Sequence, residues 1–409
     1  MSTARALLIY LILTQPATAE TAADRFAPKR GLNLELWVEW LSPDEMVTRP
    51  GFLDVFPDWR RHVPPDAVAG LAQAGFDFVR LPIDPAPFLR LGPGPAQDAL
   101  IGQVVDTAML IQTAGLKVIV DLHSIPRQDD PSGTEAIVTD PAALDAYATL
   151  VGQLAARLHG MDPDQTALEL LNEPTHDCGL AFEPDQQKWP AQLTRLHDAA
   201  RTNAPDLPLV VSGACWGGAD GLLALDPGLL SDDNLIWSFH SYGPFFFTHQ
   251  GAGWSFGPHV YFAQVPYPPT TITDEMAATL VQDASARAAA AGQVTITKDA
   301  LAAELQAYRD LPVDAVSEDI ARVADWADAH GVPRHRVLLG EFGVIRENGD
   351  GVDVPLASRA AFLDAKIGAA EAAGFGWAIY SWTGSLAIAD DRTYKIMPGF
   401  CAALRLTTC

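Results

Sequence analysis

Eight short apolar segments recur along the 409-residue chain, and several of them are separated by stretches with helical periodicity. Some of these segments, such as Val118-Ile119-Val120, are continuously apolar, as expected for strands that are covered on both faces. We predict strands over residues 31–36, 76–82, 117–123, 167–172, 209–213, 235–241, 337–342 and 376–382. Strands that alternate with helices in this way are typical of βαβ units around a parallel sheet.

The number of strands selects the architecture. Length alone permits two modest domains or one enlarged barrel, but eight strands with crossover helices favour an α/β fold of the (β/α)₈ TIM barrel type over a doubly wound sheet, which usually has five or six strands. We therefore predict a single domain over residues 20–409. Residues 244–317 form an unusually long connection, which we interpret as an insertion after the sixth strand, on the catalytic face.

The first residues predict export from the cytoplasm. Arg5 precedes an apolar run over residues 6–13, and Ala17-Thr18-Ala19 matches a small-x-small cleavage pattern. We expect a signal peptide over residues 1–19 and a secreted or periplasmic location. In an oxidising compartment the four cysteines allow three pairings. We predict Cys401–Cys409, a local pair, and with it Cys178–Cys215.

The charge balance excludes several partners. The chain has 27 Lys and Arg against 51 Asp and Glu, a net charge of −24, which would repel nucleic acid and anionic lipid surfaces. After residue 19 no segment approaches the ~20 apolar residues that a membrane span needs. The cysteine spacing matches no zinc site, so we expect no metal and no cofactor. Nothing in the sequence indicates an oligomer, and we expect a monomer.

Polar residues close the otherwise apolar strands. Because the carboxyl ends of barrel strands form the active face, these residues are the candidates for function. They are Arg80, His123, Asn172, Glu173, His240, Tyr242, Glu341 and Trp382. A buried salt-bridge network would be the plain alternative for the charged residues, and a satisfied core position for the histidines.

The pattern resembles glycoside hydrolase family 5 over about residues 30–400. Leu-Asn-Glu-Pro at 171–174 and Gly-Glu-Phe-Gly at 340–343 carry this resemblance, together with Val-Arg-Leu-Pro around Arg80, His-x-Tyr at 240–242 and Ser-Trp at 381–382, in the order of the family. The family cleaves β-glycosidic bonds with retention. That mechanism needs a protonated carboxylic acid and an ionised carboxylate about 5 to 5.5 Å apart.

The resemblance implies a role for each residue. Glu173 would be the acid/base and Glu341 the nucleophile. Arg80 and Tyr242 would hold Glu341 ionised, Asn172 would contact the sugar 2-hydroxyl, and His123 and His240 would line the reacting subsite. Because sugar rings present apolar faces that aromatic side chains can cover, we predict Trp382 under the reacting sugar and Trp37, Trp216 and Trp254 at other subsites.

The substrate expected from this resemblance is a β-linked polysaccharide, and we favour an endo-β-1,4-glucanase. A β-mannanase and an exo-acting β-glucosidase or β-1,3-glucanase are the alternatives. A metal-dependent hydrolase with His123, Glu173 and His240 as ligands is a rival, although the first strand lacks its usual His-x-His. A non-catalytic carbohydrate-binding barrel typically loses one glutamate, whereas this chain has both.

Overall fold

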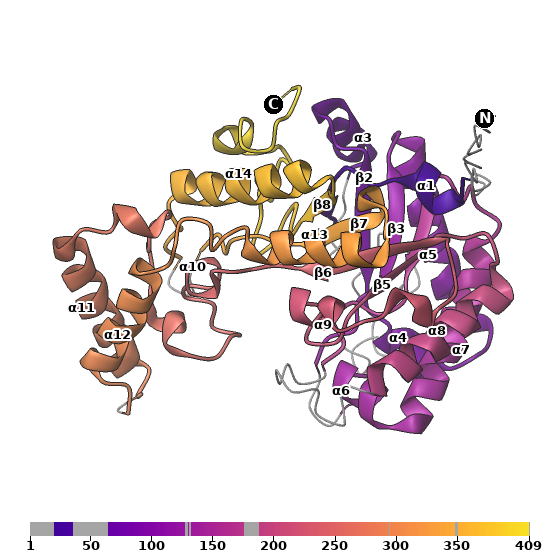
Figure 1. The fold of residues 1–409 in the computed structure, drawn as a ribbon, viewed down its shortest axis with the longest axis horizontal. Coiled ribbons are helices and arrows are strands. Elements are labelled where there is room, and N and C mark those ends of the chain that lie inside the picture. The colour runs from indigo at the N-terminus through magenta and orange to yellow at the C-terminus, as the bar shows by residue number, and fades with distance from the viewer. Residues whose placement is uncertain are drawn as a thin grey trace, which may run out of the picture.

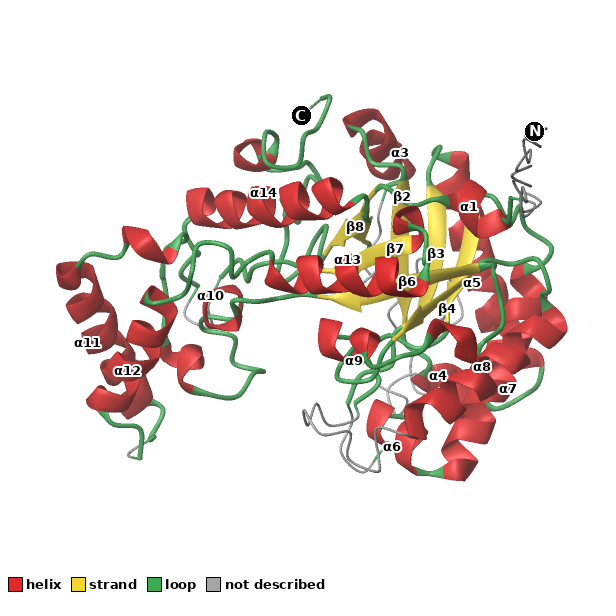
Figure 2. Cartoon of the chain, in the orientation of Figure 1, coloured by secondary structure: helices red, strands yellow, loops and turns green. Residues whose placement is uncertain are grey.

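Eight parallel strands form a closed barrel in which each strand pairs with its neighbours in sequence order (Figures 1 and 2). The computed structural model describes residues 20–35, 64–126, 130, 132–175, 188–293, 295–347 and 351–408. The strands are β1 Arg30–Asn33, β2 Phe78–Ile83, β3 Lys117–Leu122, β4 Thr166–Glu169, β5 Leu209–Ser212, β6 Leu235–His240, β7 Val337–Glu341 and β8 Gly376–Ile379. The predicted α/β barrel and all eight predicted strands are confirmed.

Helices surround the barrel. They are α1 Ala22–Phe26, α3 Pro65–Ala74, α4 Ala86–Leu91, α5 Pro95–Thr113, α6 Thr134–Thr139, α7 Pro141–Leu158, α8 Lys188–Asn203, α9 Ala219–Leu223, α10 Phe245–Thr248, α11 Asp274–Ala290, α12 Lys298–Arg309, α13 Glu318–His330 and α14 Leu356–Ala373. Short 3₁₀ turns are Pro227–Leu229, Pro258–Tyr261, Pro269–Thr271, Arg334–Arg336 and Pro398–Phe400. Gly75 ends α3 with a φ of 113°, a conformation in which glycine has no steric penalty.

Some strands are shorter at their carboxyl ends than the sequence predicts. β4 ends at Glu169 and β8 at Ile379, so Asn172, Glu173 and Trp382 all lie in the loops that follow. The chain after β4 stays extended without a regular ladder, since Leu170 N donates to Val210 O of β5 and Asn172 N to Leu122 O of β3. The loop that carries the Asn-Glu-Pro turn is thereby attached to both neighbouring strands.

The barrel interior changes character along its axis. At the amino end, an apolar cluster joins residues of seven strands to Ala23 and Phe26 of α1, and α1 closes this end of the barrel. There Gly31 is required, because a Cβ on it would lie 2.3 Å from the Phe78 ring. At the carboxyl end, the interior holds buried polar side chains such as Asn33, Arg80 and Glu169. In the described part of the chain, the carboxyl end of the barrel is thus the end that gathers groups suited to chemistry.

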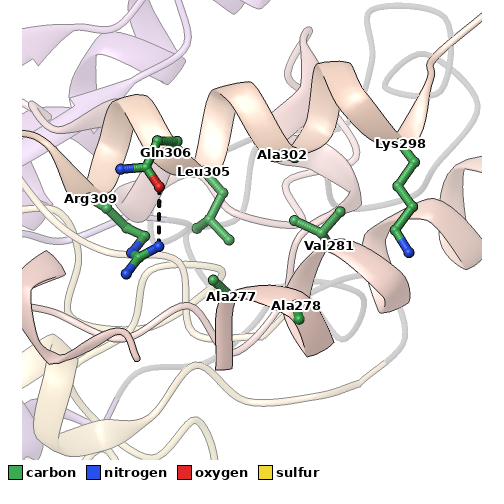
Figure 3. A pocket seen from close by; sticks show the side chains of 8 residues that line it. All are labelled: Ala277, Ala278, Val281, Lys298, Ala302, Leu305, Gln306 and Arg309. Atoms are coloured by element: carbon green, nitrogen blue, oxygen red, sulfur yellow. Dashed lines mark hydrogen bonds between the residues drawn. The ribbon is translucent and has the colours of Figure 1, made fainter. Parts of the chain in front are cut away.

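Residues 241–317 connect β6 to α13 and contain α10, α11 and α12. The helical pair α11 and α12 stands out from the barrel, at the left of Figure 1. A pocket between the two helices is lined by Val281, Ala302 and Leu305, with Lys298 and Arg309 at its ends (Figure 3). It lies away from the strand ends and contains no carboxylate, so it is not the site of the predicted chemistry.

Several predictions fall outside the described residues, namely the signal peptide over 1–19, Trp37, Cys178 and Cys409. Cys215 and Cys401 are both disulfide-bonded. The pairing itself stays a prediction, because the expected partner of each lies outside the described part of the chain. None of the described helices has the length and apolarity needed to cross a bilayer.

Candidate active site

Arg80 of β2 is the centre of a buried polar network at the carboxyl end of the barrel. Its side chain is fully buried and donates to four groups on other strands or the loops after them. Nη1 lies 2.5 Å from Glu341 Oε1 and 2.8 Å from Asn33 Oδ1, while Nε lies 2.7 Å from Glu169 Oε2 and Nη2 lies 2.7 Å from Asn172 Oδ1. Burial opposes the positive charge of Arg80, yet the neighbouring carboxylates keep its pKa well above the usual value. The guanidinium therefore stays charged and fixes both Glu341 and Asn172.

Asp121 and Glu169 belong to this network, and our sequence analysis missed them. Asp121 Oδ2 lies 3.0 Å from Arg80 Nη2 and 2.7 Å from His123 Nδ1. Both carboxylates are fully buried inside otherwise apolar strands. Their presence in apolar segments could have identified them from the sequence, because a charged residue in a buried strand requires a buried partner. Burial raises the pKa of Asp121 to about 7, so this carboxyl group is partly protonated at neutral pH. The Arg80 guanidinium therefore does not have to balance the full negative charge of every neighbouring carboxylate.

Glu341 is held on two sides. Oε1 accepts from Arg80, and Oε2 accepts from the Tyr242 hydroxyl at 2.8 Å. Burial and the nearby carboxylates raise the pKa of Tyr242 well above its usual value, so the hydroxyl remains a donor. The side chain of Glu341 is 5% exposed. A carboxylate that accepts from a cation and a hydroxyl is stabilised in its ionised form.

The position of Glu341 depends on a local irregularity in β7. The register shifts between Phe239 and His240 of β6, so Phe239 pairs with Leu339 and His240 with Glu341. Gly340 is the extra residue, and a Cβ on it would lie 2.4 Å from Ser238 Oγ. A bulge of this kind re-aims the side chains that follow it. Glycine at 340 thus permits the orientation of Glu341.

Glu173 has a different environment. Oε1 lies 2.7 Å from His240 Nδ1, and the side chain is 24% exposed. Burial raises the pKa of Glu173 to about 7, with His123 and Arg80 opposing the rise. Burial also lowers the pKa of His240 to about 4, so this imidazole is neutral at neutral pH. Glu173 therefore has a neutral neighbour and can retain a proton.

His123 and Asn172 complete the group that the sequence predicts. His123 Nδ1 is held by Asp121, and burial lowers the pKa of the ring. The Asn172 amide lies 3.4 Å from His123 Nε2 and accepts from Arg80 through its oxygen. The structure thus brings together all seven predicted polar residues, which are Arg80, His123, Asn172, Glu173, His240, Tyr242 and Glu341.

One atom each of Glu173, His240 and Glu341 lies within 4.8 Å of the other two. Three such ligands could surround a metal ion. However, Arg80 Nη1 already lies 2.5 Å from the Glu341 carboxylate, so a metal cation would bind beside a fixed positive charge. The donor set fits an acid and a carboxylate that act on one substrate better than it fits a metal centre.

The prediction for Trp382 is wrong. Its ring is 1% exposed and packs against Tyr394, with a centroid distance of 5.4 Å. The chain turns inward after β8, and Trp382 N donates to Asn33 O of β1. Tyr380 faces the site instead. Its ring stacks on His123 at 6.1 Å, and Tyr380 is among the groups that raise the pKa of Tyr242.

Trp216 and Trp254 are exposed near the site, at 46% and 58%. Trp216 N donates to Pro174 O, which attaches this residue to the turn that carries Glu173. Trp254 lies in the segment between β6 and α13 and contacts His249 edge-on at 5.2 Å. The His249 ring in turn contacts Tyr242 at 5.1 Å. Both tryptophans are therefore linked to the residues around the glutamates.

The chain is similar in sequence to several known proteins. Endoglucanase C of Acetivibrio thermocellus is 28% identical over 251 residues, 59% of this chain and 65% of that protein, so the chain spans slightly less than two thirds of this relative's length. Endoglucanase 3 of Fibrobacter succinogenes is 24% identical over 353 residues, 82% of this chain and 48% of that protein. A probable glucan 1,3-beta-glucosidase A of Emericella nidulans is 26% identical over 291 residues, 62% of this chain and 66% of that protein.

Solved structures support the fold. The endoglucanase Cel5A of Thermotoga maritima superposes with a TM-score of 0.64 at 19% identity, over 94% of this chain and 99% of that one. A cellulose synthase subunit of Clostridioides difficile gives a TM-score of 0.64 at 20% identity, over 92% of this chain and 99% of that one. The sequence profile described as "Cellulase (glycosyl hydrolase family 5)" matches residues 55–385. The chain belongs to glycosyl hydrolase family 5, the cellulase family.

Proposed function

We propose that this protein hydrolyses a β-linked glucan with retention of anomeric configuration, with Glu173 as acid/base and Glu341 as nucleophile. The observation that carries the proposal is the proximity of the two carboxylates, which lie with His240 inside a 4.8 Å group. Retaining enzymes place these carboxyl groups about 5 to 5.5 Å apart, whereas inverting enzymes leave room for a water between them.

The environments of the two glutamates support the two roles. In the first step, Glu341 attacks the anomeric carbon while Glu173 transfers its proton to the leaving oxygen, and a covalent glycosyl-enzyme forms. In the second step, Glu173 takes a proton from water, the water oxygen attacks the anomeric carbon, and Glu341 is released. Arg80 and Tyr242 stabilise Glu341 as the departing carboxylate.

Exposed aromatic side chains support a polymeric substrate. The Trp and Phe residues that are exposed in the described chain are Trp216, Phe245, Trp254 and Phe256, at 46%, 46%, 58% and 93%. Trp216 follows β5 and is bonded to Pro174 of the turn that carries Glu173. The other three follow β6, and Phe245 and Trp254 contact His249, which contacts Tyr242. Flat apolar surfaces beside a reacting pair are suited to sugar rings on either side of the cleaved bond. We interpret residues 244–317 as an insertion that supplies part of this surface.

We favour endo-acting β-1,4-glucanase activity, because relatives named endoglucanase match up to 82% of the chain. Exo-acting β-1,3-glucosidase activity is the second candidate, since proteins named as probable glucan 1,3-beta-glucosidases also match. We further propose that the protein is exported and acts as a monomer without a metal or cofactor. Turnover that survives a chelator would support the last point, and loss of turnover that Zn²⁺ restores would contradict it.

A panel of defined oligosaccharides tests the proposal. It contains cello-, laminari- and manno-oligosaccharides of two to six sugars, and the products are separated over time. Internal cleavage of cellopentaose and cellohexaose is the expected result. Release of single glucose units from laminari-oligosaccharides would select the second candidate. Cleavage of none of the three series would contradict the proposed glucanase.

A further inference from the structure

The last residue of β6, His240, and the second residue after it, Tyr242, contact the two glutamates. The side chains of His240 and Tyr242 enter the site, where His240 Nδ1 lies 2.7 Å from Glu173 and the Tyr242 hydroxyl lies 2.8 Å from Glu341. Ser241 lies between them, and its backbone N donates to Glu341 O at 3.0 Å. Because successive side chains of an extended segment point to opposite faces, the Ser241 side chain points away from the site.

Regular strand pairing fixes only part of this segment, since His240 pairs with Glu341 and His240 N donates to Gly217 O at 2.8 Å. The register between β6 and β7 shifts at Phe239 and His240, where Gly340 is left over. A bulge leaves one residue outside the ladder and bends the strand. The segment thus departs from a regular ladder at His240, and contacts beyond the ladder contribute to the positions of His240 and Tyr242.

The Ser241 side chain supplies such a contact. Its hydroxyl accepts from Lys366 Nζ of α14 at 2.6 Å and donates to Asp319 Oδ2 of α13 at 2.8 Å. These two helices pack against each other on the outside of the barrel next to β6 and β7 (Figure 1). The hydroxyl thus links the end of β6 to both helices.

Holding the end of β6 through Lys366 costs free energy, because this lysine is buried. Its side chain is 0% exposed, and burying an ammonium group is costly unless it is paired. The Phe362 ring lies 5.9 Å from Nζ, and Asp319 is the charged group that acts on it. Burial lowers the pKa of Lys366 to about 8, against the opposing effect of Asp319, so the amine keeps its charge at neutral pH. An apolar residue at this position would pack without that cost.

We infer that Lys366 is a positioning residue, which acts through Ser241 to place His240 against Glu173 and Tyr242 against Glu341. The inference rests on the proposed roles of the two glutamates. An error of about 1 Å in the position of a catalytic group can cost roughly 10²-fold in rate. Loss of Lys366 should therefore impair chemistry more than it impairs substrate binding.

The variants that test this inference are Lys366→Met, Ser241→Ala and the double variant. Lys117→Met is the matched control, because Lys117 Nζ donates to the Phe26 carbonyl at the opposite end of the barrel. For each protein, kcat and KM are measured on cellopentaose and on 2,4-dinitrophenyl β-cellobioside, and thermal unfolding is recorded. The dinitrophenolate leaves without a proton, so it separates the function of Glu173 from the rest.

For Lys366→Met we expect kcat on cellopentaose to fall by about 10- to 100-fold with little change in KM, and kcat/KM on the dinitrophenyl substrate to fall less. Ser241→Ala, which changes a single atom, should show the same pattern. The double variant should be no worse than the poorer single variant, because both break one link. Lys117→Met should lower stability and leave these ratios unchanged.

Two results would overturn the inference. One is a loss of thermal stability in Lys366→Met and Ser241→Ala with kcat/KM within about twofold of the wild type on both substrates. The other is an additive loss in the double variant. Wild-type turnover of cellopentaose tests the proposed glucanase activity. The role of Lys366 is tested by the ratios of kcat and kcat/KM between variants and wild type. Failure of the proposed activity and failure of the positioning role can therefore be told apart.

Discussion

The two glutamates occupy different halves of one site. Glu341 contacts Arg80 and Tyr242, both of which donate to it, and only 5% of its side chain is exposed. Glu173 has a neutral histidine as its hydrogen-bonding neighbour, and 24% of its side chain is exposed. The same chemical group thus lies against a cation and a hydroxyl donor in one half and against a neutral imidazole in the other.

This difference identifies the elements on which the two proposed roles depend. β2 supplies the cation through Arg80, and the end of β6 supplies a hydroxyl to one glutamate and an imidazole to the other. The fixed positive charge of Arg80 lies directly against the Glu341 carboxyl group. Glu173 has no such direct cation, and burial raises its pKa to about 7.

The largest expected effect is the loss of the nucleophile. Glu341→Ala should lower kcat by at least about 10⁴-fold, because no covalent intermediate can form. Azide should restore turnover of an aryl β-cellobioside and give a product of inverted configuration, which NMR can assign. Rescue with retained configuration would show that another residue is the nucleophile.

Loss of the proton donor should depend on the leaving group. Glu173→Gln should lower kcat/KM on cello-oligosaccharides by about 10²- to 10⁴-fold. The same variant should cleave 2,4-dinitrophenyl β-cellobioside with a much smaller loss in kcat/KM, since that leaving group needs no proton. Equal losses on the two substrates would remove the distinction between the two halves.

Removal of the Tyr242 hydroxyl, which donates to Glu341, should have a moderate effect on turnover. Tyr242→Phe removes the donor that lies 2.8 Å from Oε2 and leaves Arg80 in place. We expect kcat to fall by about 10- to 10²-fold for both leaving groups, because the nucleophile half serves both. If kcat fell only on cello-oligosaccharides, whose leaving group is poor, Tyr242 would instead act together with Glu173.

The smallest expected effect is a pH-dependent change in the free energy of unfolding of Glu173→Gln. The folded pKa of Glu173 is raised from 4.5 to about 7, so the folded state binds a proton more tightly than the unfolded state. The free energy of unfolding of the wild type therefore falls as pH rises from about 4.5 to 7. The Glu173→Gln variant has no titrating group at this position, so its stability does not fall for this reason. Urea unfolding should find Glu173→Gln about 1 to 3 kcal/mol more stable than wild type at pH 8 and about equal at pH 4. A difference independent of pH would contradict a raised pKa.

The sequence was sufficient for the barrel and for most of the polar site. Strand placement follows from apolar runs such as Val118-Ile119-Val120, and a parallel barrel brings the ends of its strands to one face whatever the loops do. Glu173, His240, Tyr242 and Glu341 lie at or just after those ends, so their convergence could be predicted, and Arg80 reaches Glu341 from within β2.

Where the chain leaves the strands, the prediction failed. After β8 the backbone turns inward, so that Trp382 is buried and Tyr380 faces the site. Side-chain direction in such a turn depends on the contacts of the loop, such as the bond from Trp382 N to Asn33 O, and no sequence period encodes them. Asp121 and Glu169 were missed for another reason, since they lie inside the predicted strands 117–123 and 167–172 rather than at their ends. Ser241 is informative only once its partners on α13 and α14 are known.

The central claim is that Glu341, and not Glu173, forms the covalent intermediate. Incubation with 2,4-dinitrophenyl 2-deoxy-2-fluoro-β-cellobioside should trap that intermediate, because the fluorine slows both steps and the dinitrophenolate leaving group accelerates only the first. Digestion and mass spectrometry should then find one equivalent of label on the peptide that contains Glu341. A label on Glu173, or no label on enzyme that still cleaves cellopentaose, would contradict the assignment.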